Sequence, residues 1–180
     1  EVLQMSTYPV AAHPELVETY PAVVKSGAGY FFDEVVEYRV WCHPERGAPD
    51  EFEGEDYFYA FATYDEALTF SHATVGTEKP LVLIRQNEWI NEPQPGQFIH
   101  EKCERIAEWR VEWLPDSKRT PGSIEDLSRI ERMANNRVNS DVQEQRRFAL
   151  PPLDAGYAGR YISQKKLRWP SCQKEFGVQQ

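Results

Sequence analysis

Cysteine is scarce in this chain, and long apolar runs are lacking. The 180 residues include three cysteines, Cys42, Cys103 and Cys172, an odd number with no C-x-x-C spacing. This count and spacing argue against a disulfide framework and against a zinc ribbon. They favour a reducing compartment, which is the cytoplasm or another such compartment, for example the mitochondrial matrix. No apolar run approaches about 18 residues, and no charged segment precedes a short apolar one, so we expect neither a membrane span nor a secretory leader.

Motifs that would identify a catalytic or ligand site are also lacking. The 4 histidines occur singly, and no nucleophile stands in a recognisable arrangement with a base. The Gly27-Ala28-Gly29 stretch has neither the third glycine nor the Lys-Ser or Lys-Thr pair of a phosphate loop, so we expect a turn there. The acidic loop at residues 44–56 lacks the ligand spacing of a calcium loop. The sequence therefore predicts no metal site and leaves any cofactor and any catalytic residue unknown.

Charge is unevenly distributed along the chain. The net charge is −9, but residues 1–115 carry 8 Lys and Arg against 21 Asp and Glu, a net −13, whereas residues 116–180 carry 12 against 8, a net +4. An acidic body repels nucleic acid, while a basic tail can contact an acidic partner, RNA or a second copy. We therefore predict an acidic α+β domain at residues 5–115 and a basic arm at residues 116–180, which is helical at first and then extended.

The middle of the chain predicts a strand, a helix and a second strand. Residues 57–62 are aromatic and apolar, as is typical of a buried strand. Thr63 and Glu66 have the spacing of a capping box, which starts a short helix that Gly76 ends. Residues 81–84 form a short apolar run that predicts the next buried strand. Because this order favours a crossover connection, we expect the two strands to be parallel within one sheet.

Residues 35–43 predict a further strand with two different faces. Alternation places Arg39, Trp41 and His43 on one face, together with Glu37. A guanidinium, an indole and an imidazole in one row can bind an anion or a planar ligand. The alternative is that Arg39 pairs with an acid and Trp41 packs under a loop. The opposite face is predicted to join the core through Val36, Tyr38, Val40 and Cys42.

The following segment predicts a loop and then a hairpin. Residues 86–97 contain a Pro-x-Pro-Gly turn and are expected to form the loop. Residues 97–101 and 105–114 are expected to pair as the hairpin, whose second arm exposes a solvated ladder of Glu108, Arg110 and Glu112. The predicted fold class is α+β, with a mostly antiparallel mixed sheet of about five strands, one short central helix and a helical and extended C-terminal arm.

The predicted arm begins after Pro115. Ser123 is expected to cap a helix, with Asp126 three residues on and Ile124 and Ile130 on its apolar stripe. Beyond residue 141 the apolar residues are too isolated to form a core, so we expect this segment to order against a protein partner or a second copy. Nucleic acid is a possible partner only through this tail. The candidate partner-binding residues are Arg146, Arg147, Tyr157, Tyr161 and Trp169.

Two stretches resemble a known family. The sequences YFFDEVVEYRVWCHPERGAPDEF and DYFYAFATYDEALTFS are similar to small bacterial proteins, chiefly alphaproteobacterial, commonly identified as GNAT-type N-acetyltransferases. The resemblance covers roughly residues 7–115. It implies acetyl-CoA as cofactor and supplies no site residues.

A second resemblance is to small mono-ADP-ribosyltransferases. It rests on the stretch FATYDEALTFSHAT followed by PLVLIR. It implies a nicotinamide dinucleotide ligand, lined by Arg39, Tyr59, Thr63 and Glu112. Three function classes thus remain: a non-catalytic binding or accessory module of a larger assembly, which the basic arm favours, an acetyltransferase, and an ADP-ribosyltransferase-like domain.

Overall fold

The computed structural model describes residues 7–148. The chain divides after Arg137 into two units, Glu1–Arg137, called the front unit below, and Val138–Gln180, called the rear segment. The described elements are β1 (Lys25–Ser26), β2 (Glu34–Cys42), β3 (Tyr57–Phe61), α1 (Tyr64–Ala73), β4 (Leu81–Gln86), β5 (Trp89–Gln94), β6 (Gln97–Glu101), β7 (Arg105–Arg110) and α2 (Leu127–Phe148). Their mixture confirms the predicted α+β class.

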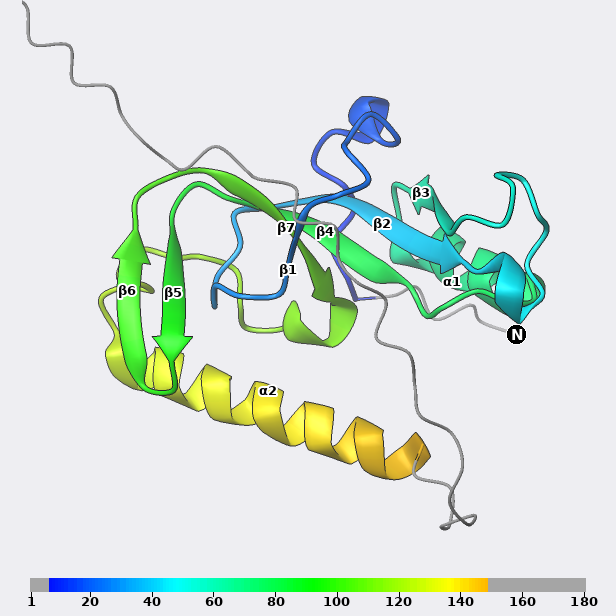
Figure 1. The fold of residues 1–180 in the computed structure, drawn as a ribbon. Helices are drawn as coiled ribbons and strands as arrows, with labels where there is room; N and C mark the ends of the chain where they lie inside the picture. Colours follow the sequence, from blue (N-terminus) through cyan, green and yellow to red (C-terminus); the bar gives the residue numbers. More distant parts are fainter. Residues whose placement is uncertain (1–6, 149–180) are drawn as a thin grey trace, which may run out of the picture. The chain divides into compact units, whose positions relative to one another are not determined.

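The main sheet has five strands in the order β1-β7-β4-β2-β3, which can be followed in Figure 1. β1 is parallel to β7, and the other neighbouring pairs are antiparallel. The predicted mostly antiparallel mixed sheet is therefore confirmed. β3 and β4 are both antiparallel to β2, which lies between them, so they are parallel to one another as predicted.

The start of α1 also agrees with the sequence prediction. Thr63 Oγ1 accepts a hydrogen bond from the amide of Glu66 at 3.3 Å, and the Glu66 carboxylate accepts from the amide of Thr63 at 3.2 Å. This reciprocal pair is the capping box. Beyond the helix, Gly76 has φ +76°, and a Cβ there would lie 2.2 Å from the backbone nitrogen of Ala48, so only glycine fits.

A β-bulge changes the predicted core face of β2. The register with β4 shifts between Val35 and Glu37, so Val35 opposite Ile84 joins the same face as Tyr38. Val36 is buried, as predicted, but the prediction that it shares a face with Tyr38 and Val40 is wrong, because the extra residue of the bulge rotates it out of phase. The main core consists of Phe32, Val35, Tyr38, Val40, Ala67, Val82, Ile84, Ala107, Trp109, Val111 and Leu114.

The predicted hairpin is wrong in its pairing. β6 pairs with β5 in a separate two-stranded sheet, and β7 pairs with β4 and β1 of the main sheet. Residues 86–97, predicted as a loop, thus contain strand β5, and Gly96 with φ +79° lies in the turn to β6. Pro93 lies where the β5–β6 register shifts, a position where a strand tolerates a missing amide.

The start of α2 differs from the prediction by three residues. Asp126 Oδ1 accepts from the amide of Arg129 at 3.1 Å, so Asp126 is the cap. Ser123 instead accepts from the amide of Thr120 within the preceding turn. Ile124 and Ile130 are buried in a second cluster with Tyr30, Phe31 and Ile90. The segment up to Arg137 therefore packs with the front unit, whereas the sequence places its boundary at residue 115.

The remaining general features concern membranes and thiols. Neither α1 nor α2, as far as the described residues reach, combines the length and apolar content that a bilayer crossing needs. Cys42 is buried and Cys103 partly exposed, and both are free thiols.

Candidate functional site

The face of the sheet opposite α1 carries a buried polar cluster, formed by Glu37, Arg39, Trp41 and Glu108. Glu37 and Arg39 are 0% exposed, and Arg39 Nε donates to Glu37 Oε1 at 2.7 Å. The other guanidinium nitrogens of Arg39 donate to the carbonyls of Pro21 at 3.0 Å and Ala22 at 3.3 Å. The segment around Pro21 and Ala22 thus covers this face, and each of the three guanidinium nitrogens of Arg39 has a hydrogen-bond acceptor inside the fold.

Glu108 of β7 adds a second carboxylate to the buried polar cluster. Its Oε1 accepts from Trp41 Nε1 at 3.1 Å and lies 4.0 Å from Arg39 Nη1. Burial raises the pKa of Glu108, although the hydrogen bond from Trp41 and the charge of Arg39 act in the opposite direction. Two carboxylates therefore share one guanidinium.

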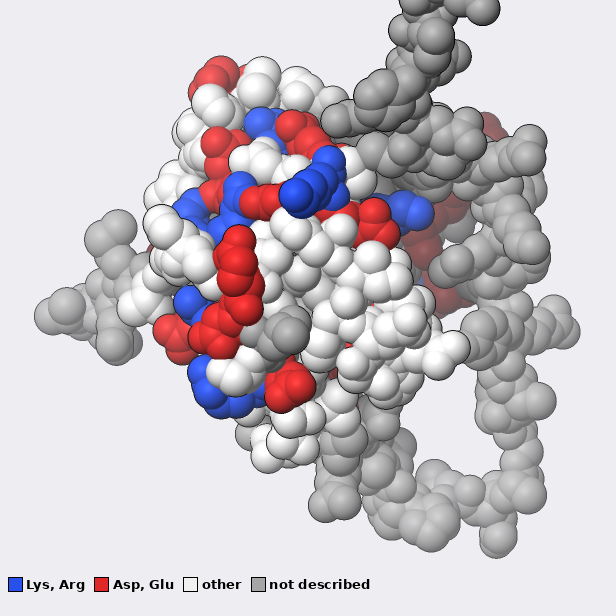
Figure 2. Space-filling model, turned by 90° about the vertical axis from the view of Figure 1, so that its left-hand side faces the viewer, with Lys and Arg blue, Asp and Glu red and all other residues white. Residues whose placement is uncertain are grey.

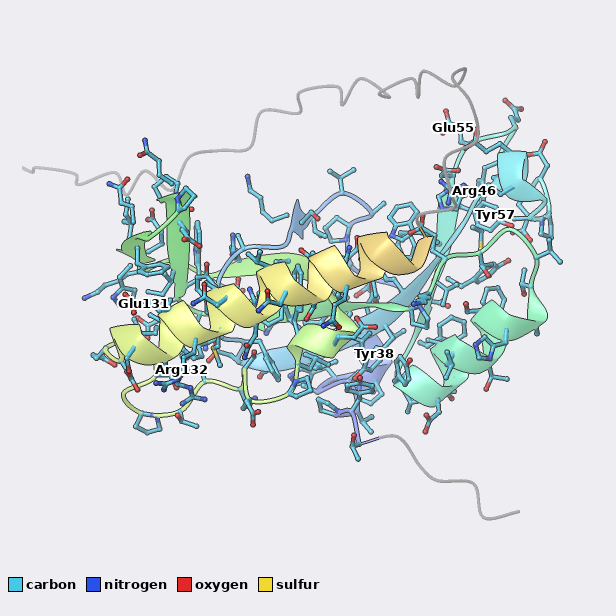
Figure 3. The ribbon with its side chains drawn as sticks, turned by 90° about the horizontal axis from the view of Figure 1, so that it is seen from below. Tyr38, Arg46, Glu55, Tyr57, Glu131 and Arg132 are labelled. Atoms are coloured by element: carbon cyan, nitrogen blue, oxygen red, sulfur yellow. The ribbon has the colours of Figure 1, made fainter. Side chains whose placement is uncertain are left out.

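His43 lies directly after β2 between two carboxylates. Its Nδ1 is 2.9 Å from Asp56 Oδ1, and its Nε2 is 3.0 Å from Glu78 Oε1. Glu78 Oε1 also lies 3.2 Å from Arg46 Nη1. Figure 3 shows Arg46 and Tyr57 in this region, where β2 ends and β3 begins.

The chemistry available on this face is limited by how its groups are used. Arg39 can bind an external anion only by giving up its contacts with Glu37 and the two carbonyls. Within residues 7–148, no group of three or more His, Cys, Asp or Glu side chains is placed to hold a metal ion. This arrangement supports the alternative in which Arg39 pairs with an acid, and Trp41 is held by Glu108.

The other predicted ligand-binding residues lie elsewhere. Tyr59 pairs in register with Val40, on the opposite face of the sheet from Arg39, and its hydroxyl donates to the Glu51 carboxylate at 2.9 Å. The Thr63 hydroxyl is used in the capping box.

Glu112 is exposed in a single 3-10 turn, Val111–Trp113, because β7 ends at Arg110 and not at residue 114 as predicted. The structure brings Arg39 and Trp41 together at Glu108. His43, two residues after Trp41, contacts Asp56 and Glu78 instead. Tyr59 and Thr63 are separate from that group.

The candidate partner-binding residues fall largely outside the described part of the chain. Tyr157, Tyr161 and Trp169 lie beyond residue 148. Arg146 and Arg147 lie within α2, where their side chains are not described.

Sequence reasoning missed the residues that complete this face. Glu108 was predicted to be a solvated ladder residue, and Asp56 and Glu78 were not singled out. The available signal was the position of Glu37 and Arg39 two residues apart in a strand flanked by valines, since a fully buried strand needs internal partners for its charges.

A surface pocket of about 400 Å³ lies at another part of the front unit. Arg119 Nε donates to Asp33 Oδ1 at 2.7 Å, and its Nη1 pairs with Glu88. Figure 2 shows acidic and basic side chains intermixed on the side of the front unit that carries β5 and β6. The residues lining the pocket are Asp33, Glu88, Arg119, Thr120, Pro121, Gly122, Ile124 and Glu125.

Comparison with family models, with curated proteins and with solved structures found no match. The resemblances to acetyltransferases and ADP-ribosyltransferases stay predictions from the sequence.

Proposed function

We propose that this chain is a non-catalytic binding or accessory module of a larger assembly, in which the rear segment binds an acidic partner. The observation that carries the proposal is that the charge changes sign between the two structural units. Glu1–Arg137 has 13 Lys and Arg against 25 Asp and Glu, a net −12, while Val138–Gln180 has 7 against 4, a net +3. Opposite charge on two units of one chain gives each a different class of partner.

The buried polar cluster argues against a catalytic role for Arg39. Its guanidinium is enclosed and hydrogen-bonded, whereas a catalytic group must reach its substrate. The hydroxyls of Tyr59 and Thr63, which the ADP-ribosyltransferase resemblance implicates, are engaged by glutamates of the same chain. No contact of the described residues favours either enzyme alternative.

The experiment that tests this function is affinity capture with the full chain and two charge-reversed variants. Arg146→Glu with Arg147→Glu reverses two charges next to the rear segment's predicted anchors. Lys102→Glu with Arg132→Glu changes the net charge by the same amount at two exposed positions of the front unit, and serves as the matched control. Nuclease treatment of each sample separates proteins from nucleic acid as the captured partner.

We expect the first variant to lose the captured protein and the control to retain it. Equal capture by both variants would contradict the proposal that the rear segment binds the partner. A thermal-shift panel with acetyl-CoA and the nicotinamide dinucleotide tests the alternatives: we expect no stabilisation, and a saturable rise in melting temperature with either ligand would replace the accessory role by the corresponding enzyme class.

A further inference from the structure

Three aromatic rings of the front unit surround one guanidinium group. The Arg137 guanidinium carbon lies 4.4 Å from the ring centre of Trp109, 4.7 Å from that of Trp113 and 5.0 Å from that of Tyr30. The two tryptophan rings are steeply inclined, with an interplanar angle of 73° and centres 6.1 Å apart. We call Tyr30, Trp109 and Trp113 the aromatic cage. Such walls attract organic cations through the negative faces of the rings.

Two walls of the aromatic cage, Trp109 and Tyr30, make hydrogen bonds to residues outside α2. Trp109 is 1% exposed, and its Nε1 donates to the carbonyl of Ala28 at 3.0 Å. The Tyr30 hydroxyl donates to the carboxylate of Glu92 on β5, which places a negative charge beside the cage. Because these hydrogen bonds come from the sheet and its loops, and Tyr30 also packs in the cluster of Ile130, we expect both rings to keep their positions when Arg137 alone is replaced.

The cage also has an acceptor that selects among cations. The carbonyl of Gly29 accepts from Arg137 Nη1 at 2.6 Å. A guanidinium offers N–H donors as well as a planar face, whereas a quaternary ammonium group has no donor. The combination of rings and carbonyl therefore suits a guanidinium best.

Residues 131–137, the part of α2 that delivers Arg137, are partly buried or exposed. The side chains through which α2 joins the second apolar cluster are Ile130, fully buried, and Met133 and Ala134, partly buried. The division between the two units falls directly after Arg137, inside α2. Few buried apolar contacts at a unit boundary are typical of a segment that opens locally.

We propose that the aromatic cage is a guanidinium-binding site whose resident occupant is Arg137. An arginine side chain or a free guanidine replaces Arg137 when the part of α2 that ends at Arg137 moves away from the cage. The site belongs to the front unit and takes a cation. It is therefore independent of the proposed function, which places an acidic partner on the rear segment.

The test measures whether an emptied cage binds added cations. Arg137→Ala removes the occupant and keeps a good helix former, and Arg137→Gln, which is shorter and uncharged and is also a good helix former, serves should the alanine variant not fold. Arg132→Ala, at an exposed position of the same helix, is the matched control. The probes are methylguanidine, N-acetyl-arginine methylamide and tetramethylammonium, each compared with sodium chloride at equal ionic strength.

We expect both Arg137 variants to gain about 3 °C in melting temperature at saturating methylguanidine, with a smaller gain in tetramethylammonium. A matching response to the arginine amide assigns the site to a protein side chain, and a response to methylguanidine alone assigns it to a small guanidine. Adding Trp113→Leu to Arg137→Ala should abolish the gain.

Absence of a saturable gain in melting temperature, or the same gain in Arg132→Ala, would overturn the proposal. The double reversal at Arg146 and Arg147 should leave this titration unchanged, so either proposal can fail alone.

Discussion

Replacing Arg39 by methionine should destabilise the front unit strongly. The substitution removes the guanidinium between Glu37 and Glu108 and leaves Glu37, which is 0% exposed, with a single described donor, the amide of Glu18 at 2.9 Å. Breaking a buried ion pair from one side costs about 3–5 kcal/mol. A typical domain has only about 5–15 kcal/mol of stability, so a large part of the total would be lost.

Urea unfolding at neutral pH measures the effect. With a denaturant slope of about 2 kcal/mol per molar, the midpoint should fall by about 2 M. Arg46→Met is the control, because Arg46 is 57% exposed and pairs with Glu78 at the surface, where the loss should stay below about 1 kcal/mol. Glu37→Met combined with Arg39→Met should lose less than Arg39→Met alone, since the fully buried Glu37 charge is then gone and Glu108 keeps its hydrogen bond from Trp41. An Arg39→Met variant within about 0.5 kcal/mol of wild type would refute this account of the buried polar cluster.

Three further predictions concern other parts of the front unit. The folded state raises the pKa of Glu108 above the ordinary value of 4.5, so between these two pKa values the folded chain binds more protons than the unfolded chain. Stability therefore falls as pH rises from 4.5 through the raised pKa of this group. Glu108→Gln should therefore gain stability relative to wild type as pH rises, and parallel urea curves of both proteins across pH check this. Thr63→Ala should cost about 1 kcal/mol by removing the α1 cap, seen as a lower urea midpoint with unchanged slope. Ile130→Ala should cost about 2–5 kcal/mol in the same unfolding transition as Arg39→Met, and a separate transition for residues after 115 would contradict their packing with the front unit.

Local signals predicted the central stretch of the fold well. The Thr63 and Glu66 pair acts over three residues, so the capping box follows directly from spacing. The parallel arrangement of β3 and β4 follows from the short helix between them, and the structure adds β2 in the space separating them. The cap depends on contacts within one stretch of chain, whereas the parallel arrangement also needs β2 from outside that stretch.

Pairing between distant strands was harder to predict. β5 contains Pro93 and precedes Pro95, and these residues indicate a loop in a local pattern. The strand forms because a two-stranded hairpin has outer edges on which a missing amide costs little. β6 pairs with β5, so the prediction that it pairs with residues 105–114 is wrong.

The burial of the polar face of β2 was not predicted, for a similar reason. Alternation assigns Glu37 and Arg39 to one face but does not tell whether that face meets water. Their burial comes from the preceding segment, where the Glu18 amide and the Pro21 carbonyl contact these two side chains. A cover supplied from 18 or 19 residues away has no signature in the strand itself.

Hydrogen exchange on the full chain, with and without the captured partner, tests the proposed role most directly. Amides protected by an interface exchange more slowly, and each peptide reports its own position. The accessory-module account predicts that slowing concentrates in residues 138–180, while β2 and β7 exchange as they do in the free protein. Slowing confined to residues 1–137, with the rear segment unchanged, would contradict it.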